Sequence, residues 1–123
     1  KLTCPVNQKD YIRVPLKTIL HHIKESWNCN LKKQAYYFCD DPICDVVYFG
    51  EDGSTINKSE LRTKIGIKEK SQKALICYCF GISMDDVIQN SKIKNFVIQQ
   101  TKKGNCSCET SNPSGRCCLK DFP

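Results

Sequence analysis

The sequence predicts an α+β fold, with a small mixed αβ unit over residues 1–70 followed by a helical unit over residues 71–123. Three observations lead to this prediction. The first half has a helical pattern followed by two runs of β-branched and aromatic residues, helical spacing dominates after residue 77, and the ten cysteines divide into four before residue 70 and six after it. With 123 residues, of which 40% are hydrophobic, the chain can form one domain or two very small ones.

The first unit begins with an amphipathic helix near residues 15–23. Four apolar residues recur at i, i+3, i+4 and i+7: Leu16, Ile19, Leu20 and Ile23. The runs 35–38 and 46–49 predict two strands, because aromatic and β-branched residues favour extended backbone. Cysteines bound the turn between these strands.

The second unit is predicted to be helical. Ser83 is an expected N-cap, since two aspartates follow it in the first turn, and Ser91 is an expected cap of a second helix. Gly104 is the expected end of that helix. The segment 112–115, Asn-Pro-Ser-Gly, predicts a turn.

Charge and hydropathy narrow the functional classes. The net charge is +6, and the tract 61–76 has five basic residues against one acidic residue, which is typical of a solvated connector or of a docking face for an acidic partner. Nucleic acid is disfavoured as a partner because the tract lacks interleaved aromatic residues. The longest apolar run, 74–80, is too short for membrane insertion. We therefore expect a cytoplasmic protein.

The cysteine spacing favours metal ligation over disulfides. Cys77 and Cys79 are too close in sequence to crosslink distant elements, and a Cys117–Cys118 bond would close a strained ring. All-thiolate sites select zinc, Cu(I) or iron–sulfur clusters. No Ser-His-Asp spacing, phosphate loop or H-E-x-x-H string is present, so we expect no catalytic residues and no enzyme, or at most a redox protein.

The segment 77–83, Cys-Tyr-Cys-Phe-Gly-Ile-Ser, followed by Asp-Asp-Val at 85–87, resembles the start of the bacterioferritin-associated-ferredoxin type of [2Fe-2S] domain. Together with 36–49 and 112–118, nearly the whole chain resembles the N-terminal domain of CopZ-type copper chaperones. That resemblance implies one zinc ion in residues 1–70 and one [2Fe-2S] cluster in residues 71–123. The family's separate copper-carrying domain, with its M-x-C-x-x-C motif, is not in this sequence.

The resemblance also implies the cluster ligands. They are Cys77, Cys79, Cys108 and either Cys118, which we favour, or its neighbour Cys117. Cys106 is then a spare thiol, either a free loop thiol without a role or a ligand that can replace one of the four.

For zinc, the resemblance implies Cys4, Cys39 and Cys44 as three ligands. The fourth departs from the family pattern, because Asn7 stands where a C-P-x-C start would have a cysteine. Cys29 is the expected substitute, with His21 or His22 as the next candidates.

The function implied is one-electron transfer or redox sensing linked to metal, and in particular copper, handling. The alternative is a non-redox metal-delivery or protein-interaction module whose metal sites are structural. In either case the expected partner is a redox or metallochaperone protein, such as a separate copper chaperone domain, without nucleic acid or membrane insertion.

Overall fold

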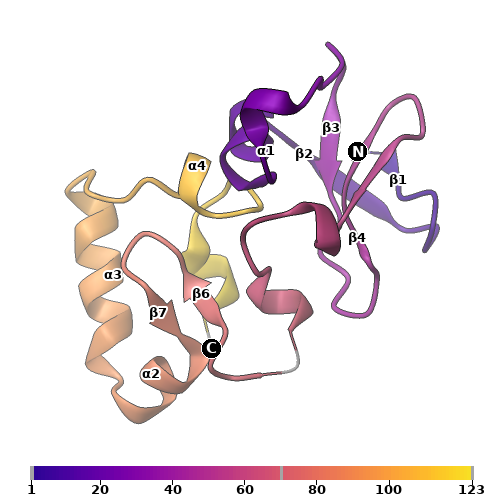
Figure 1. Ribbon diagram of the computed structural model, residues 1–123. Coiled ribbons are helices and arrows are strands. Elements are labelled where there is room, and N and C mark those ends of the chain that lie inside the picture. The colour runs from indigo at the N-terminus through magenta and orange to yellow at the C-terminus, as the bar shows by residue number, and fades with distance from the viewer. Residues whose placement is uncertain (1, 70, 123) are drawn as a thin grey trace.

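The computed structural model describes residues 2–69 and 71–122. A five-stranded antiparallel sheet forms the first part of the fold, with its strands in sequence order: β1 (Leu2–Thr3), β2 (Asp10–Val14), β3 (Tyr36–Phe38), β4 (Val46–Gly50) and β5 (Thr55–Asn57). Helix α1 (Leu16–His22) and the 3₁₀ helix η1 (Ser26–Asn28) lie in the connection between β2 and β3. Figure 1 shows α1 beside the sheet and the α2–α3 region on the other side of the molecule.

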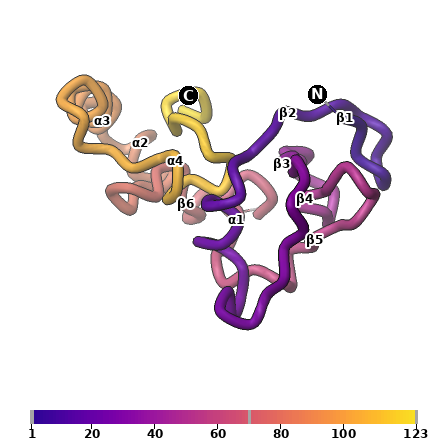
Figure 2. The backbone as a smooth tube through the Cα atoms, turned by 90° about the horizontal axis from the view of Figure 1, so that it is seen from above, coloured from indigo at the N-terminus to yellow at the C-terminus, as the bar shows by residue number. Residues whose placement is uncertain are grey.

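The second part begins with a two-stranded sheet of β6 (Leu75–Cys77) and β7 (Ile82–Ser83). Three helices and a terminal 3₁₀ helix follow: α2 (Met84–Gln89), α3 (Lys92–Lys102), α4 (Cys108–Ser111) and η4 (Cys118–Asp121). Two 3₁₀ turns, η2 (Lys58–Glu60) and η3 (Gly66–Lys68), connect the parts. Seen from above, α3 and strands β1–β5 lie at opposite sides, with the C-terminal segment between them (Figure 2).

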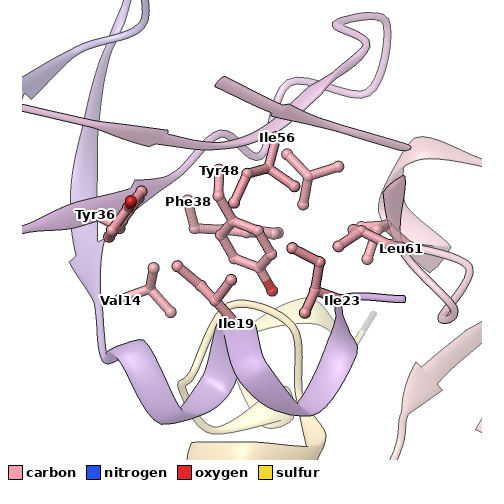
Figure 3. Packing of buried hydrophobic residues seen from close by; sticks show 10 residues of the cluster. Val14, Ile19, Ile23, Tyr36, Phe38, Tyr48, Ile56 and Leu61 are labelled. Atoms are coloured by element: carbon pink, nitrogen blue, oxygen red, sulfur yellow. The ribbon is translucent and has the colours of Figure 1, made fainter. Parts of the chain in front are cut away.

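Strand β4 is buried along its whole length because both faces of the sheet are covered. Val47 and Tyr48 face the main core, in which α1 packs against the sheet (Figure 3). Val46 and Phe49 belong instead to a second cluster, which contains three cysteines. A register irregularity between Val46 and Tyr48 accounts for the two consecutive residues on the main-core side. The central strand therefore supports the hydrophobic core on one face and the thiols on the other.

Several predicted elements are confirmed. Helix α1 and strands β3 and β4 occur where the pattern indicated, and the Ser83 hydroxyl caps α2 by accepting a hydrogen bond from the Asp86 N–H at 3.2 Å. Helix α3 ends just before Gly104, whose φ of +75° is the left-handed conformation of a helix stop. The turn at 112–115 is closed by the Gly115 N–H, which donates to the Asn112 carbonyl.

Other expectations were wrong. Residues 75–83 form the hairpin of β6 and β7 rather than continuing into helix, because this short stretch pairs its own backbone before α2 begins. Ser91 precedes α3 but its side chain makes no capping hydrogen bond, and the Asn90 side chain accepts the Lys92 N–H instead. None of the helices in the described residues is long and apolar enough to cross a membrane.

The basic tract also differs from the solvated connector that its composition suggested. Lys68 is only 3% exposed, because its ammonium donates hydrogen bonds to backbone carbonyls of the β3–β4 loop. Hydrogen bonds also join the two parts of the fold: the Tyr48 hydroxyl donates to the Pro113 carbonyl at 2.6 Å, and the Thr18 hydroxyl donates to the Glu109 carbonyl. The division of the chain at residue 70 into separate units stays a prediction.

Candidate metal centres

Three thiols meet on the face of the sheet opposite α1. Cys4 lies on the β1–β2 turn, where its N–H and carbonyl bond to Lys9 and Gln8. Cys39 and Cys44 lie at the two ends of the β3–β4 loop. The Cys39 N–H donates a hydrogen bond to the Val47 carbonyl, and Asp41 accepts the N–H groups of Ile43 and Cys44 in a turn. All three are buried, and their Sγ atoms lie within 4.8 Å of one another. In a tetrahedral zinc site, Zn–S bonds of about 2.3 Å place sulfurs roughly 3.8 Å apart, so this arrangement fits a zinc ion.

Polar side chains surround these thiols. The Asn7 Nδ2 donates to the Cys39 Sγ at 3.2 Å and to the Tyr11 hydroxyl at 3.0 Å, and lies 3.4 Å from the Asp41 carboxylate. Burial is the main cause that raises the pKa of Tyr11, and its hydrogen bond with Cys39 adds to the effect. Burial likewise raises the pKa of the Cys44 thiol.

Lys68 supplies positive charge at this site, and sequence reasoning missed it. Its Nζ donates to the Asp41 carbonyl at 2.8 Å and the Cys44 carbonyl at 3.0 Å, and it lies 3.9 Å from the Cys39 Sγ. In the sequence, Lys68 simply follows the apolar residues Ile65 and Ile67 within the basic tract. Nothing there distinguishes it from an exposed lysine such as Lys64.

The structure does not bring Cys29 to the three thiols. Cys29 follows η1 and packs against the main core, whereas Cys4, Cys39 and Cys44 belong to the cluster on the other face of the sheet. His21 and His22, at the end of α1, do not join the group either. His22 is buried, and its Nε2 bonds the Thr110 carbonyl while its Nδ1 bonds the Thr63 hydroxyl. Among the described residues, no fourth Cys, His, Asp or Glu completes the set.

Four further thiols converge in the second part of the fold. Cys77 ends β6, Cys79 lies in the β6–β7 turn, and Cys108 and Cys118 begin α4 and η4. The Cys79 and Cys108 Sγ atoms are 3.5 Å apart, and Cys77 and Cys118 belong to the same buried cluster. Three of them belong to a buried cluster with apolar residues such as Ile76, Val87, Val97 and Phe122, and Cys79 packs against it.

Their protonation is mutually dependent. The hydrogen bond from Cys118 lowers the pKa of Cys77 to about 6, with further help from the backbone of Phe80 and Cys79 and against the effect of burial. The same hydrogen bond raises the pKa of Cys118, and burial raises the pKa of Cys108 to about 12. The Ser107 N–H also donates to the Cys79 Sγ at 3.2 Å. The Cys77 thiolate is thus stabilised, whereas Cys108 and Cys118 stay protonated until a cation replaces their protons.

The remaining two thiols of this region lie apart from these pairs. Cys117 is exposed at the start of η4, while Cys118 beside it is 1% exposed. Cys106 is half-buried and packs against the outside of the same cluster.

The donor sets suit soft metals. Three thiols on two short loops can bind zinc, and four thiols in two adjacent pairs have the donor number and type of a [2Fe-2S] cluster. The two sets lie in separate hydrophobic clusters.

Comparison with known proteins agrees with this arrangement of the first site. Residues 1–62 match a family described as a zinc binding domain of the CopZ type. A relative named copper chaperone CopZ, from Archaeoglobus fulgidus, is 34% identical over 121 residues, which are 95% of this chain and 58% of the relative. The chain thus spans little more than half of that relative's length.

A solved structure shows the same fold. The X-ray structure of the Archaeoglobus fulgidus CopZ N-terminal domain matches with a TM-score of 0.79 at 32% identity, covering 99% of each chain. The fold agrees over both parts of the molecule, and the sequence match extends well beyond the zinc-binding segment. The chain therefore belongs to the CopZ-type zinc-binding domain family.

Proposed function

We propose that this chain is a zinc and [2Fe-2S] protein that carries single electrons in metal handling. The zinc would be held by Cys4, Cys39 and Cys44, and the cluster by Cys77, Cys79, Cys108 and Cys118. The bound cluster would supply a one-electron acceptor and donor.

The observation that carries the proposal is the gathering of four cysteines from separate segments at one buried apolar cluster, with the Cys79 and Cys108 Sγ atoms 3.5 Å apart. A single buried thiol is ordinary as a small core residue, whereas four thiols gathered in one place form the donor set of a [2Fe-2S] cluster. The burial of Cys118 in the same cluster as Cys77 favours it over the exposed Cys117 as the fourth ligand.

The residues around the thiols have a defined task in this proposal. The Ser107 N–H donates to Cys79, and such hydrogen bonds to ligand sulfurs tune the potential of iron–sulfur proteins. The apolar cluster shields Cys77, Cys108 and Cys118 from water, whereas Cys79 is half-buried.

The test is anaerobic purification followed by iron, sulfide and zinc analysis and a visible absorption spectrum. We expect two irons, two sulfides and one zinc per chain. Cys77→Ser and Cys79→Ser should each lose the iron and the colour, whereas Cys106→Ser should keep both. Wild-type protein that folds with zinc but retains no iron or sulfide after reconstitution would contradict the cluster assignment.

The second candidate is a non-redox module for metal delivery or protein interaction, which the relative's description as a copper chaperone favours at least as well. A reductive titration followed by electron paramagnetic resonance distinguishes the two. A reversible one-electron reduction supports electron transfer. A cluster that stays oxidised under strong reductant supports the second candidate.

The partner in either case is a metal-handling protein. The proposal places the protein in the cytoplasm, where thiols remain reduced and available as ligands.

A further inference from the structure

An amide side chain lies beside the three-thiol site. The Asn7 Nδ2 donates to the Cys39 Sγ at 3.2 Å from the β1–β2 turn that also carries Cys4. Two further hydrogen bonds fix the amide, since its Oδ1 accepts the Lys9 N–H at 2.9 Å and its Nδ2 donates to the Tyr11 hydroxyl. Within the described residues no acidic, histidine or further cysteine donor atom lies within 4.8 Å of all three sulfurs.

The charges at the site favour a neutral fourth ligand. A divalent ion with three thiolates has a net charge of −1, and the buried Lys68 ammonium, fixed by two carbonyls, balances it. A fourth protein thiolate would add a negative charge, and Lys68 is the only buried lysine or arginine among the described residues. Asn7 adds no charge.

We infer that the metal bound by Cys4, Cys39 and Cys44 has a neutral oxygen donor, the Asn7 amide oxygen or a water molecule beside it, as its fourth ligand, and that an external neutral donor can take this position. The inference rests on the zinc ligation proposed above. Zinc sites closed by four protein thiolates are structural, whereas a position without a strong protein ligand accepts exogenous donors. The zinc is therefore an exchangeable ion in addition to a support of the fold.

Zinc-edge X-ray absorption of the purified full chain tests the ligand set. We expect three sulfur neighbours and one light neighbour in the wild type and four sulfurs in Asn7→Cys. Val6→Cys is the matched control, because it adds a thiol to the same turn at an exposed position and should leave three sulfurs. Four sulfurs in the wild type would overturn the inference.

Zinc release to a chromogenic chelator tests exchange. We expect the wild-type rate to rise with the concentration of added imidazole, a neutral donor, and Asn7→Cys to slow release about tenfold and weaken the dependence on imidazole. Asn7→Ala should retain zinc and release it faster than wild type. Equal rates in all three proteins would overturn the inference. Wild type that binds no zinc, or Cys39→Ser that keeps it unchanged, would instead refute the underlying zinc ligation.

Discussion

The imidazole of His22 and the carbonyl of Thr110, 88 residues later, are joined by a 2.8 Å hydrogen bond. A carbonyl can only accept, so Nε2 carries the proton, and Nδ1 accepts from the Thr63 hydroxyl. The neutral ring thus connects the end of α1 to the connector and to α4. Burial lowers the pKa of His22 to about 4, with an added effect from His21.

We expect His22 to make folding stability depend on pH. Its pKa is lower in the folded protein than the ordinary 6.5, so the unfolded chain binds more protons between pH 6.5 and 4. Neutral His22 makes its full contribution to the free energy of unfolding above pH 6.5. This contribution, at most about 3 kcal/mol, is lost as the pH falls towards 4. Chemical denaturation at pH 7.5 and pH 5 should show a smaller loss of stability in His22→Gln than in wild type. Equal losses would contradict this role, and His21→Gln, at an exposed position, is the control.

Lys68→Met should weaken zinc retention. The substitution removes the ammonium near Cys39 and leaves the Asp41 and Cys44 carbonyls without this donor. Loss of such groups around metal ligands costs about 10–100-fold in affinity. Competition with a chelator measures the effect. Lys64→Met, an exposed lysine of the same tract, should behave as wild type, and an equal effect of both substitutions would show a general charge effect.

Cys118→Ser and Cys117→Ser should differ sharply. Cys118 is buried in the same cluster as Cys77, whereas Cys117 is exposed. We expect iron content and visible absorbance to be lost in Cys118→Ser and preserved in Cys117→Ser after identical reconstitution. The opposite result would reassign the fourth cluster ligand.

Gly115→Ala should destabilise the fold more than Gly104→Ala. Both glycines have left-handed backbone, with φ of +73° and +75°. That strain costs about 1–2 kcal/mol for a residue with a Cβ. At Gly115 the Cβ would also meet Pro15 at 3.0 Å and Thr18 and Val14 at 3.2 Å, whereas at Gly104 it would have open space. Thermal unfolding should show the larger decrease in Tm for Gly115→Ala, and equal decreases would show that the α1 contact is unimportant.

The sequence predicted the elements whose signals are local. The spacing of Leu16, Ile19 and Ile23 indicated α1, and Ser83 with its aspartates indicated the start of α2. Strand β2 escaped prediction because it places charged Asp10 and Arg13 and an exposed Ile12 beside its two buried residues.

The same distinction applies to the sites. Spacing and resemblance indicated the cysteines that the structure brings together, because turns place them near one another. Cys29 does not lie with the other three thiols, because it follows η1 and packs against the main core. Its local sequence does not indicate which face of the sheet it contacts. Lys68 and His22 could not be predicted, because their burial depends on carbonyls at residues 41, 44 and 110 that are distant in sequence.

Strand β4 has a consequence for the cooperativity of unfolding. Its residues pack against α1 on one face and stand beside the thiols on the other, and its Tyr48 reaches the Pro113 carbonyl. Because the same strand contributes to both clusters, loss of structure around the thiols directly destabilises the main core. A chelator that acts only on the metal should accordingly lower the temperature of the calorimetric transition of the whole first part of the chain, α1 included.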